Sequence, residues 1–274
     1  MRRRVTIARP RGFTLVEAIA VIAVTGVVAA TVAVFVRAPV LGYVDTARRL
    51  ELADAANTAT RRIGRDLRLA LPNSVRVSSS GSTVALEFLL LRSGGRYRAE
   101  PDGGGLGDVL DFTSAADASF DVLGAAVEVG AGDQIVVYNL GVPGADAYAG
   151  ANRRAYPGAA GTVGNIAFTP TASPFPFASP SQRFQVVQTA VSYICDTSAR
   201  TLTRYWGYAI VAAQPNPPVG GNSALIASDV SACTITYDPL VVAYRAGLVT
   251  LRVTLDRDGE AVSLYHAVHV SNVP

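Results

Sequence analysis

The sequence has no lysine, two cysteines, two histidines and one tryptophan among its 274 residues. All 24 basic residues are arginine, which we interpret as codon usage rather than chemistry. Two cysteines and two histidines do not fit the ligand spacings of a four-ligand zinc site. Neither a P-loop nor a G-x-S-x-G nucleophile motif occurs. The sequence therefore offers only weak catalytic constellations, and we predict no cofactor.

The remaining candidate metal ligands are widely separated or wrongly spaced. His266 and His269 lie three residues apart in a predicted strand, and strand alternation sends them to opposite faces. Asp102, Asp108 and Asp111 could approach a calcium ion, but the EF-hand spacing is absent. We therefore interpret them as loop acids and predict no metal site.

Positive charge is concentrated at the start of the chain. Residues 1–12 contain five arginines and no acidic residue. Residues 13–274 hold 19 arginines against 21 acidic residues, a charge of −2 before the termini. The basic isoelectric point therefore belongs largely to the first twelve residues, and bulk charge gives no reason to expect nucleic-acid binding.

A 24-residue apolar run extends from Phe13 to Val36, and Glu17 is its only charged residue. At about 1.5 Å per residue such a helix spans roughly 36 Å, enough to cross a bilayer core of about 30 Å. A carboxylate inside a membrane helix costs roughly 2.5–3.5 kcal/mol. Because anchoring alone does not need that cost, we expect Glu17 to have a function. Small residues such as Gly26 and Ala30 let other helices approach this segment closely.

The string R-G-F-T-L-V-E at Arg11–Glu17 resembles the leader of type IV prepilins and type II secretion pseudopilins. The resemblance implies that a prepilin peptidase cuts between Gly12 and Phe13 and methylates the new amino terminus of Phe13. It also implies that Glu17 guides docking between subunits. Residues 1–12 would then be a cleaved basic leader, and 13–36 a transmembrane helix that later enters a fibre core.

Other targeting signals explain this segment less well. An ordinary single-span anchor accounts for the arginines through the positive-inside rule, but not for the position of Glu17. A secretory signal peptide has an apolar region of about 7–15 residues, shorter than this run. A twin-arginine signal fails because no arginine pair leads directly into an uncharged apolar core.

Residues 37–71 are predicted to continue the helix as an amphipathic segment. Pro39 and Gly42 predict a kink or a short break at the join, and Pro72 ends the helix. Apolar residues recur at three- and four-residue spacing, which predicts one packing face. That face comprises Leu52, Ala55, Ala59, Ile63, Leu67 and Ala70.

Residues 72–274 form a predicted β-rich domain. Its Val-, Ile-, Tyr- and Thr-rich segments predict strands, with hairpin turns at Asp196–Arg200 and Asp256–Gly259. Between Ala99 and Gln182 the abundance of Gly, Ala and Pro predicts long surface loops. The predicted strands are Thr83–Arg92, Gln134–Leu140, Phe184–Cys195, Leu202–Val211, Cys233–Tyr237, Leu248–Asp256 and Ala261–Val270.

The only two cysteines, Cys195 and Cys233, lie in the part of the chain expected outside the cytoplasm, where oxidation is permitted. A bridge between them would close a loop of roughly 38 residues and add about 3–4 kcal/mol on the chain-entropy model. The alternative is two buried free thiols. We favour the disulfide.

Further strings look like the MshO subfamily of minor pilins from the mannose-sensitive haemagglutinin (MSHA) pilus system. This resemblance implies an α+β fold, with a long N-terminal helix packed on an antiparallel sheet, and an assembly subunit rather than an enzyme. The strings are residues 40–45, 47–49, 65–74, 191–196, 202–208 and 268–274.

The implied partners are prepilin peptidase, the major and other minor pilins, an inner-membrane assembly platform and, before assembly, membrane lipid. The implied location is the bacterial inner membrane, as a single-pass protein with a periplasmic C-terminal domain, and afterwards the pilus and cell surface. Three function hypotheses stand at this stage. The chain is a minor pilin at or near the pilus tip, a type II secretion pseudopilin, or a tip adhesin that binds ligands through the loops of residues 99–182.

Overall fold

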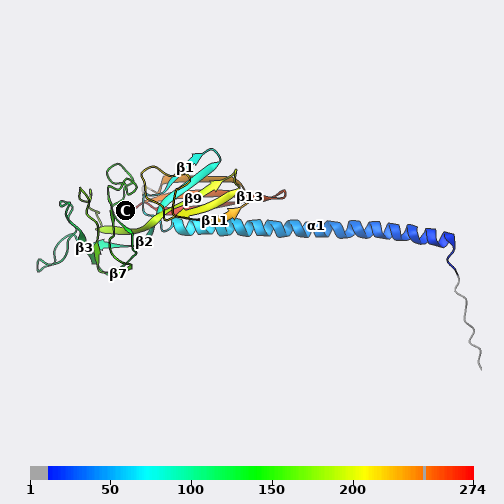
Figure 1. Cartoon of the computed structure of the whole chain (residues 1–274), viewed down its shortest axis with the longest axis horizontal. Helices are drawn as coiled ribbons and strands as arrows, with labels where there is room; N and C mark the ends of the chain where they lie inside the picture. Colours follow the sequence, from blue (N-terminus) through cyan, green and yellow to red (C-terminus); the bar gives the residue numbers. More distant parts are fainter. Residues whose placement is uncertain (1–11, 243–244) are drawn as a thin grey trace, which may run out of the picture. The chain divides into compact units, whose positions relative to one another are not determined.

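The computed structural model describes residues 12–242 and 245–274. It divides into two compact units, Met1–Leu50 and Glu51–Pro274. One helix, α1 (Leu15–Leu67), runs from the first unit into the second, and all strands belong to the second unit (Figure 1). The strands are β1 (Arg76–Ser80), β2 (Thr83–Tyr97), β3 (Ser119–Leu123), β4 (Val127–Val129), β5 (Gln134–Val137), β6 (Arg153–Ala155), β7 (Gly161–Val163), β8 (Asn165–Ala167), β9 (Arg183–Asp196), β10 (Thr201–Trp206), β11 (Asn222–Ser228), β12 (Val230–Val242), β13 (Ala246–Arg257) and β14 (Glu260–Ser271).

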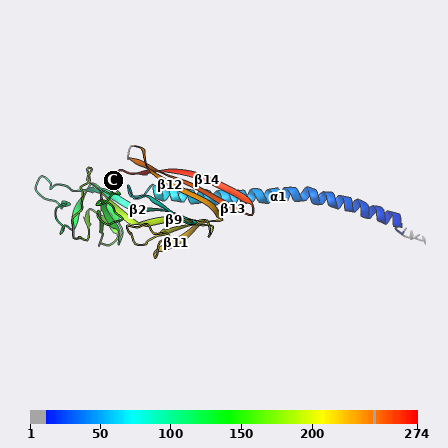
Figure 2. The same ribbon diagram turned by 90° about the horizontal axis from the view of Figure 1, so that it is seen from above.

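Antiparallel sheets make up the second unit. The largest has nine strands, with the path β11-β10-β9-β2-β3-β8 and with β1, β5 and β6 attached at its sides. A three-stranded sheet has the order β12-β13-β14, and β4 pairs with β7. Figure 2 shows strands of the two larger sheets beside the C-terminal part of α1. An N-terminal apolar helix followed by antiparallel sheets confirms the predicted α+β, pilin-like fold class.

Helix α1 is more continuous than the sequence predicted, but it is slightly shorter. It continues through Pro39 and Gly42 without interruption, so the predicted alternative of a short break is wrong, and a kink stays a prediction. A proline inside a helix removes one backbone hydrogen bond, and the flanking turns hold the helix together here. At its other end α1 stops at Leu67 rather than Leu71.

The early end of α1 has a clear cause in backbone pairing. The amide of Leu71 donates to the carbonyl of Leu89 at 2.8 Å, and the amide of Leu91 donates to the carbonyl of Leu69 at 2.8 Å. Ala70 also forms a bridge with Leu90. The chain therefore leaves the helix in order to pair with the middle of β2.

One face of α1 in the second unit enters the main hydrophobic core. Leu52, Ala59, Ile63 and Leu67 are buried as predicted, with at most 2 % of each residue exposed. Ala55 is exposed, and its neighbour Ala56 is fully buried instead. The predicted packing position at Ala55 is therefore wrong by one residue. The helix turns residues 52, 56, 59, 63 and 67 toward the sheets. The core that this face enters also contains residues of β2, β9, β10, β11, β12, β13 and β14.

All seven predicted strands are present, with shifted ends. Strand β5 ends at Val137, three residues before the predicted end, because Tyr138 has a positive φ of 51°. Strand β10 ends at Trp206, where Gly207 follows with a φ of 74°. A backbone in this left-handed region cannot continue a strand.

Both predicted hairpins are confirmed. Strands β13 and β14 pair directly across Asp258 and Gly259, whose φ values of 52° and 85° match the turn chemistry of an Asp-Gly pair. In the turn between β9 and β10, the Asp196 carboxylate accepts the amides of Ser198 and Ala199 at 2.8 and 3.1 Å.

The segment between residues 99 and 182 is more ordered than predicted. Six short strands, β3 to β8, lie within it; only β5 was predicted, so the expectation that long loops make up the rest of the segment is wrong. Aromatic packing explains the order. The ring centres of Phe120 and Phe184 lie 5.0 Å apart, edge to face, and those of Phe168 and Phe175 lie 5.4 Å apart. These side chains belong to a second hydrophobic core, which the Gly- and Pro-rich composition concealed.

Candidate processing and assembly site

The predicted cleavage junction lies just before α1. Gly12, Phe13 and Thr14 precede the first helical residue, Leu15, and are exposed. The Phe13 side chain is 74 % exposed, and a Cβ atom at Gly12 would meet nothing within 4 Å. The other eleven leader residues lie outside the described part of the chain. The junction is therefore accessible in the first unit.

Thr14 begins the helix through a local hydrogen bond. Its Oγ1 accepts the amide of Glu17 at 3.3 Å, and its carbonyl accepts the amide of Ala18 at 3.1 Å. A threonine followed three residues later by glutamate is the sequence of a capping box. A carboxylate in the first turn also interacts favourably with the helix dipole. Cutting after Gly12 therefore leaves the helix start intact.

Glu17 stands out within the apolar segment that follows. Leu15–Phe35 is long and apolar enough to cross a membrane, and none of its residues is buried in the structure. The hydroxyls of two threonines in this segment are already hydrogen-bonded within the helix. The Thr25 hydroxyl donates to the carbonyl of Val21 at 2.7 Å, and the Thr31 hydroxyl donates to that of Val27 at 3.1 Å. Within the described residues, the carboxylate of Glu17 has no hydrogen-bond or ion-pair partner. It is therefore the group in this segment that needs a partner from outside the chain.

A polar contact ties α1 to the large sheet in the second unit. The Asp66 carboxylate accepts hydrogen bonds from Arg204 Nε at 2.9 Å and from the Tyr193 hydroxyl at 2.8 Å. Burial and the adjacent Asp66 charge raise the pKa of Tyr193 well above its usual value. The hydroxyl therefore stays protonated and acts as a donor to the carboxylate.

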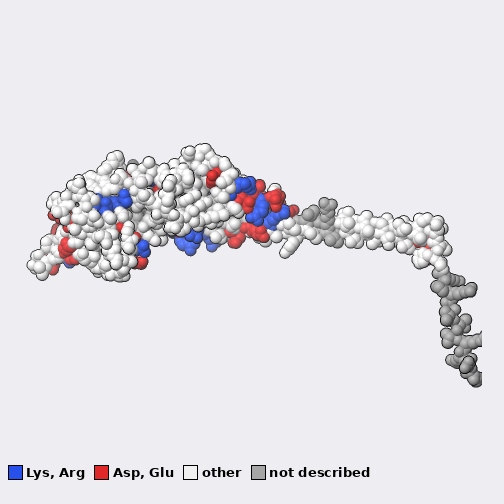
Figure 3. Space-filling model, in the orientation of Figure 1, with Lys and Arg blue, Asp and Glu red and all other residues white. Residues whose placement is uncertain are grey.

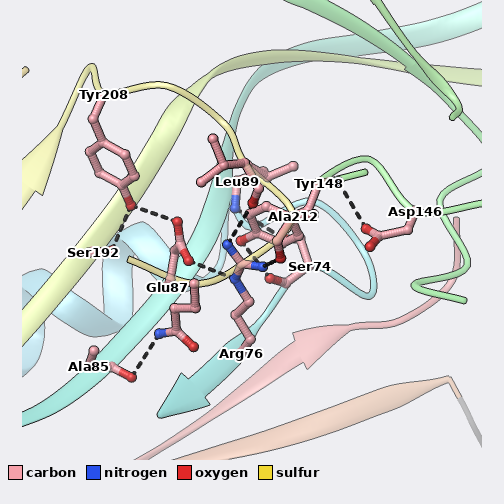
Figure 4. A network of polar contacts seen from close by, with 12 residues as sticks. Ser74, Arg76, Ala85, Glu87, Leu89, Asp146, Tyr148, Ser192, Tyr208 and Ala212 are labelled. Carbon is pink, nitrogen blue, oxygen red and sulfur yellow. Dashed lines mark hydrogen bonds and ion pairs between the residues drawn. The ribbon is translucent and has the colours of Figure 1, made fainter. Parts of the chain in front are cut away.

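A second polar network lies inside the large sheet, around Glu87 on β2 (Figure 4). This carboxylate is fully buried and accepts Arg76 Nε at 2.6 Å and the Tyr208 hydroxyl at 2.9 Å. The Tyr208 hydroxyl also lies 2.6 Å from the Ser192 hydroxyl. Burial raises the pKa of Glu87, while the hydrogen bond to Arg76 opposes the shift. Sequence reasoning missed this network, although a single acid within the apolar string 83–91 was a signal.

Arg76 links this network to two loops. Its guanidinium lies 3.6 Å from the centre of the Tyr148 ring and donates to the carbonyls of Ala212 at 2.6 Å and Val211 at 3.1 Å. The Tyr148 hydroxyl donates to the carbonyl of Ser74 at 2.9 Å. These contacts hold the segments around Tyr148 and Ala212 against the sheet. The role of Arg76 that they indicate is structural.

The two cysteines lie side by side as free thiols. Cys195 is buried on β9 and Cys233 is partly buried on β12. A hydrogen bond to Cys195, together with burial, raises the pKa of the Cys233 thiol. A protonated thiol is a poor nucleophile, so the Cys233 thiol is not activated as a nucleophile. The proximity that a disulfide needs is present, and the bond itself stays a prediction.

The candidate metal ligands do not converge. In the described ranges, no group of three His, Cys, Asp or Glu residues could hold a metal ion. On β14, His269 is exposed and His266 is half-buried, as strand alternation predicts. Asp102 accepts the amide of Leu106 at 2.9 Å, and Asp111 accepts that of Thr113 at 2.7 Å. The amide hydrogen bonds lower the pKa of Asp102, and the Thr113 hydroxyl, which donates to Asp111 at 2.6 Å, lowers the pKa of Asp111 together with the Thr113 amide. Both acids organise their own loops.

Comparison with known proteins supports the reading of the N-terminal segment. Residues 7–33 match the prokaryotic N-terminal methylation motif. Comparison with characterised proteins and with solved structures gave no match. The motif and the exposed apolar helix indicate a prepilin-like protein with a membrane-anchoring segment. Within that class the motif indicates a type IV pilin-like or pseudopilin-like prepilin, which a prepilin peptidase processes and which assembles with other pilins.

Proposed function

We propose that this chain is a minor pilin of an MSHA-like type IV pilus, a structural subunit rather than an enzyme. A prepilin peptidase cuts between Gly12 and Phe13 and methylates Phe13. The chain resides in the inner membrane with its β-rich unit in the periplasm, and then enters the pilus at or near its tip. The MSHA assignment rests on the resemblance to MshO-type sequences, and the prepilin class rests on the methylation motif.

The observation that carries this proposal is the unpartnered carboxylate of Glu17 at the start of an exposed apolar helix. A lone carboxylate in hydrocarbon is costly, whereas one paired with a cation recovers much of its desolvation cost. The methylated amine of Phe13 on an adjoining subunit is a suitable cation. Such a pair fixes the register between subunits as well as stabilising the contact.

The proposal is tested first by intact-mass measurement of the chain extracted from membranes. The expected mass corresponds to a chain that begins at methylated Phe13. A chain that begins at Met1, or one that begins after Ala33, contradicts the proposed processing.

The assembly role is tested with Glu17→Ala, with Thr25→Ala as the matched control in the same segment. The Thr25 hydroxyl is already hydrogen-bonded within the helix, so its removal takes away no group that needs a partner from another subunit. Both variants should insert into the membrane. Only Glu17→Ala should be missing from isolated pili, and normal incorporation of that variant contradicts the pairing mechanism.

A type II secretion pseudopilin is the second candidate, because the N-terminal methylation motif and the long helix are common to both classes. The two are separated by a deletion strain. Loss or shortening of surface pili, with normal export of secreted enzymes, supports the minor pilin. The reverse pattern supports the pseudopilin.

A further inference from the structure

The solvent face of α1 in the second unit carries charges of both signs, separated along the helix. Glu51 and Asp54 are exposed on it, Arg61 and Arg65 are exposed further along, and Arg68 is exposed directly after the helix ends at Leu67. At 3.6 residues per turn, the four helical residues lie within an arc of about 80°, opposite the face that enters the core. Figure 3 shows basic side chains protruding beside the helix in the folded unit. The face therefore has a basic end and an acidic end, and at the acidic end Glu51 also forms an ion pair with Arg257 at 3.4 Å, which leaves Asp54 as the carboxylate without a partner among the described residues of the folded unit.

The basic end of this face is hollowed. Arg61, Gly64, Arg65, Arg68 and His266 line a surface hollow of about 550 Å³. Gly64 forms part of its lining, and a Cβ atom there would lie 2.7 Å from His266 Nε2. Glycine inside a helix costs about 1 kcal/mol relative to alanine. The glycine thus lets β14 approach the helix closely and brings an imidazole to the arginines.

The arginines of the hollow are available for a partner. Across the part of the chain that the structure describes, Arg65 and Arg68 form no hydrogen bond or ion pair. Arg61 donates to the Asn57 side chain at 2.9 Å. Asp66 is the only acid between Arg61 and Arg68, and its carboxylate is held by Arg204 and Tyr193. The hollow therefore lacks internal neutralisation.

The charge pattern favours a protein partner over an extended polyanion. A nucleic-acid strand following the helix beyond the hollow would meet the carboxylates of Glu51 and Asp54, and residues 13–274 carry a small net negative charge. Guanidinium groups match carboxylates in two-point hydrogen bonds. A neighbouring subunit can present acidic residues to the hollow and basic residues to the acidic end.

We propose that this face of α1 docks an adjoining fibre subunit, whose carboxylates enter the hollow between Arg61, Arg65 and Arg68. The inference rests on the proposed function, because it requires assembly into a fibre. From Glu51 to Arg65 the helix rises about 21 Å. The partner surface therefore carries basic and acidic groups in the opposite order at a similar separation, and the two contacts together fix the axial stagger of the subunits.

The test uses the full chain with Arg65→Glu and Arg68→Glu combined. The matched control combines Arg183→Glu and Arg252→Glu, which reverse two other exposed arginines with the same change in net charge. Two measurements are made on each: the mass of the processed chain in membranes and its amount in isolated pili. Processing should be normal in both, and incorporation should fall at least about tenfold for the Arg65/Arg68 variant only, a difference of about 1.4 kcal/mol.

Each other result either overturns the docking surface or supports it. Normal incorporation of the Arg65/Arg68 variant overturns the proposal, as does equal loss in the control. Suppressor substitutions from acidic to basic residues in another subunit support it. Suppressors at Glu51 or Asp54 of this chain also support it and identify the adjoining subunit as a second copy. Binding of a single-stranded oligonucleotide by the detergent-extracted wild-type chain, lost in the variant, indicates a polyanion site instead.

The outcome for the proposed function can be distinguished from the outcome for the docking surface. If the wild-type chain is neither cut before Phe13 nor found in fibres, the proposed function fails and no docking partner of this kind exists. If the wild type is processed and incorporated normally while the reversal has no effect, only the docking surface fails. Gly64→Ala provides an independent check, because its methyl group displaces His266 and narrows the hollow without changing charge; incorporation should fall partially.

Discussion

The carboxylate of Asp66 on α1 lies 2.9 Å from Nε of Arg204 on β10. Arg204 is 8 % exposed, and the fully buried Tyr193 donates to the same carboxylate oxygen. One acid at the end of the helix thus satisfies two donors of the large sheet. The contact fixes the rotation of α1 about its axis in the folded unit, which the apolar packing of alanines alone would define less sharply.

Asp66→Ala should lower the free energy of unfolding by about 3 kcal/mol, because it leaves a buried guanidinium without its counter-ion. Urea denaturation of the detergent-extracted chain measures this effect. Asp54→Ala is the matched control on the exposed face of the same helix, and should change stability by less than about 0.5 kcal/mol. Equal effects of the two substitutions contradict a structural role for the Asp66 contact.

Glu87 should make stability depend on pH. Burial raises its pKa above the ordinary value of 4.5. A carboxyl whose pKa is higher in the folded chain than in the unfolded chain stabilises the fold at pH values below its pKa in the unfolded chain. This stabilisation is lost as the pH rises through its pKa in the folded chain. The free energy of unfolding should therefore contain a component that decreases as pH rises above about 4.5.

Glu87→Gln removes this component while leaving a side chain that can still accept a hydrogen bond. Urea midpoints measured from about pH 4 to about pH 8 should fall less with rising pH in the variant than in the wild type. Parallel pH profiles for the two proteins would show that Glu87 titrates equally in the folded and unfolded chain.

Cys195 and Cys233 should form a disulfide when the chain is exported to an oxidising compartment. Their thiols are already hydrogen-bonded, so little backbone movement is needed. The bond should raise the free energy of unfolding by about 3–4 kcal/mol relative to the reduced chain. Mass spectrometry of unreduced peptides checks the linkage, with Cys233→Ser as the control. Two free thiols in protein isolated from the periplasmic side would refute it.

The register of the helix face is tested by neighbouring alanines. Ala56 is fully buried in the core, whereas Ala55 is exposed. Leucine at position 56 should overpack the core and cost about 1–3 kcal/mol. Leucine at position 55 should change stability by less than about 0.5 kcal/mol. A larger loss of stability from leucine at position 55 than at position 56, measured from denaturation curves, would support Ala55 as the packing position that the sequence pattern predicted.

The second unit should fold without the apolar segment. A chain beginning at residue 43 keeps the buried face of α1 and should be monomeric in buffer, with a cooperative thermal transition. A chain beginning at Pro72 lacks Leu52, Ile63 and Leu67, exposes the core that they cover, and should aggregate. Size-exclusion chromatography separates these outcomes. A stable monomer from the shorter chain would show that helix packing is dispensable.

Local patterns in the sequence predicted the features that depend on local chemistry. Seven strands, two hairpins and the α+β class follow from alternation, turn residues and apolar spacing, and the methylation motif is contiguous. The polar contacts could not be predicted in the same way. Asp66 meets Arg204 across 138 residues and Glu87 meets Tyr208 across 121, and no spacing rule connects such positions. The helix end was misplaced because pairing of residues 69–71 with β2 outweighed their helical pattern.

The pairing of β2 with β9 also determines how the unit can fold. Residues that pair in these strands lie roughly 90 to 110 positions apart, so a large loop must close before the pair is stabilised. By contrast, β13 and β14 meet across a two-residue turn, and contacts of that kind form rapidly. We therefore expect the C-terminal hairpin to form early and the centre of the large sheet to form late. In the interval the apolar stripe of α1 has only part of its final cover, and the chain is then most sensitive to proteases and most dependent on chaperones.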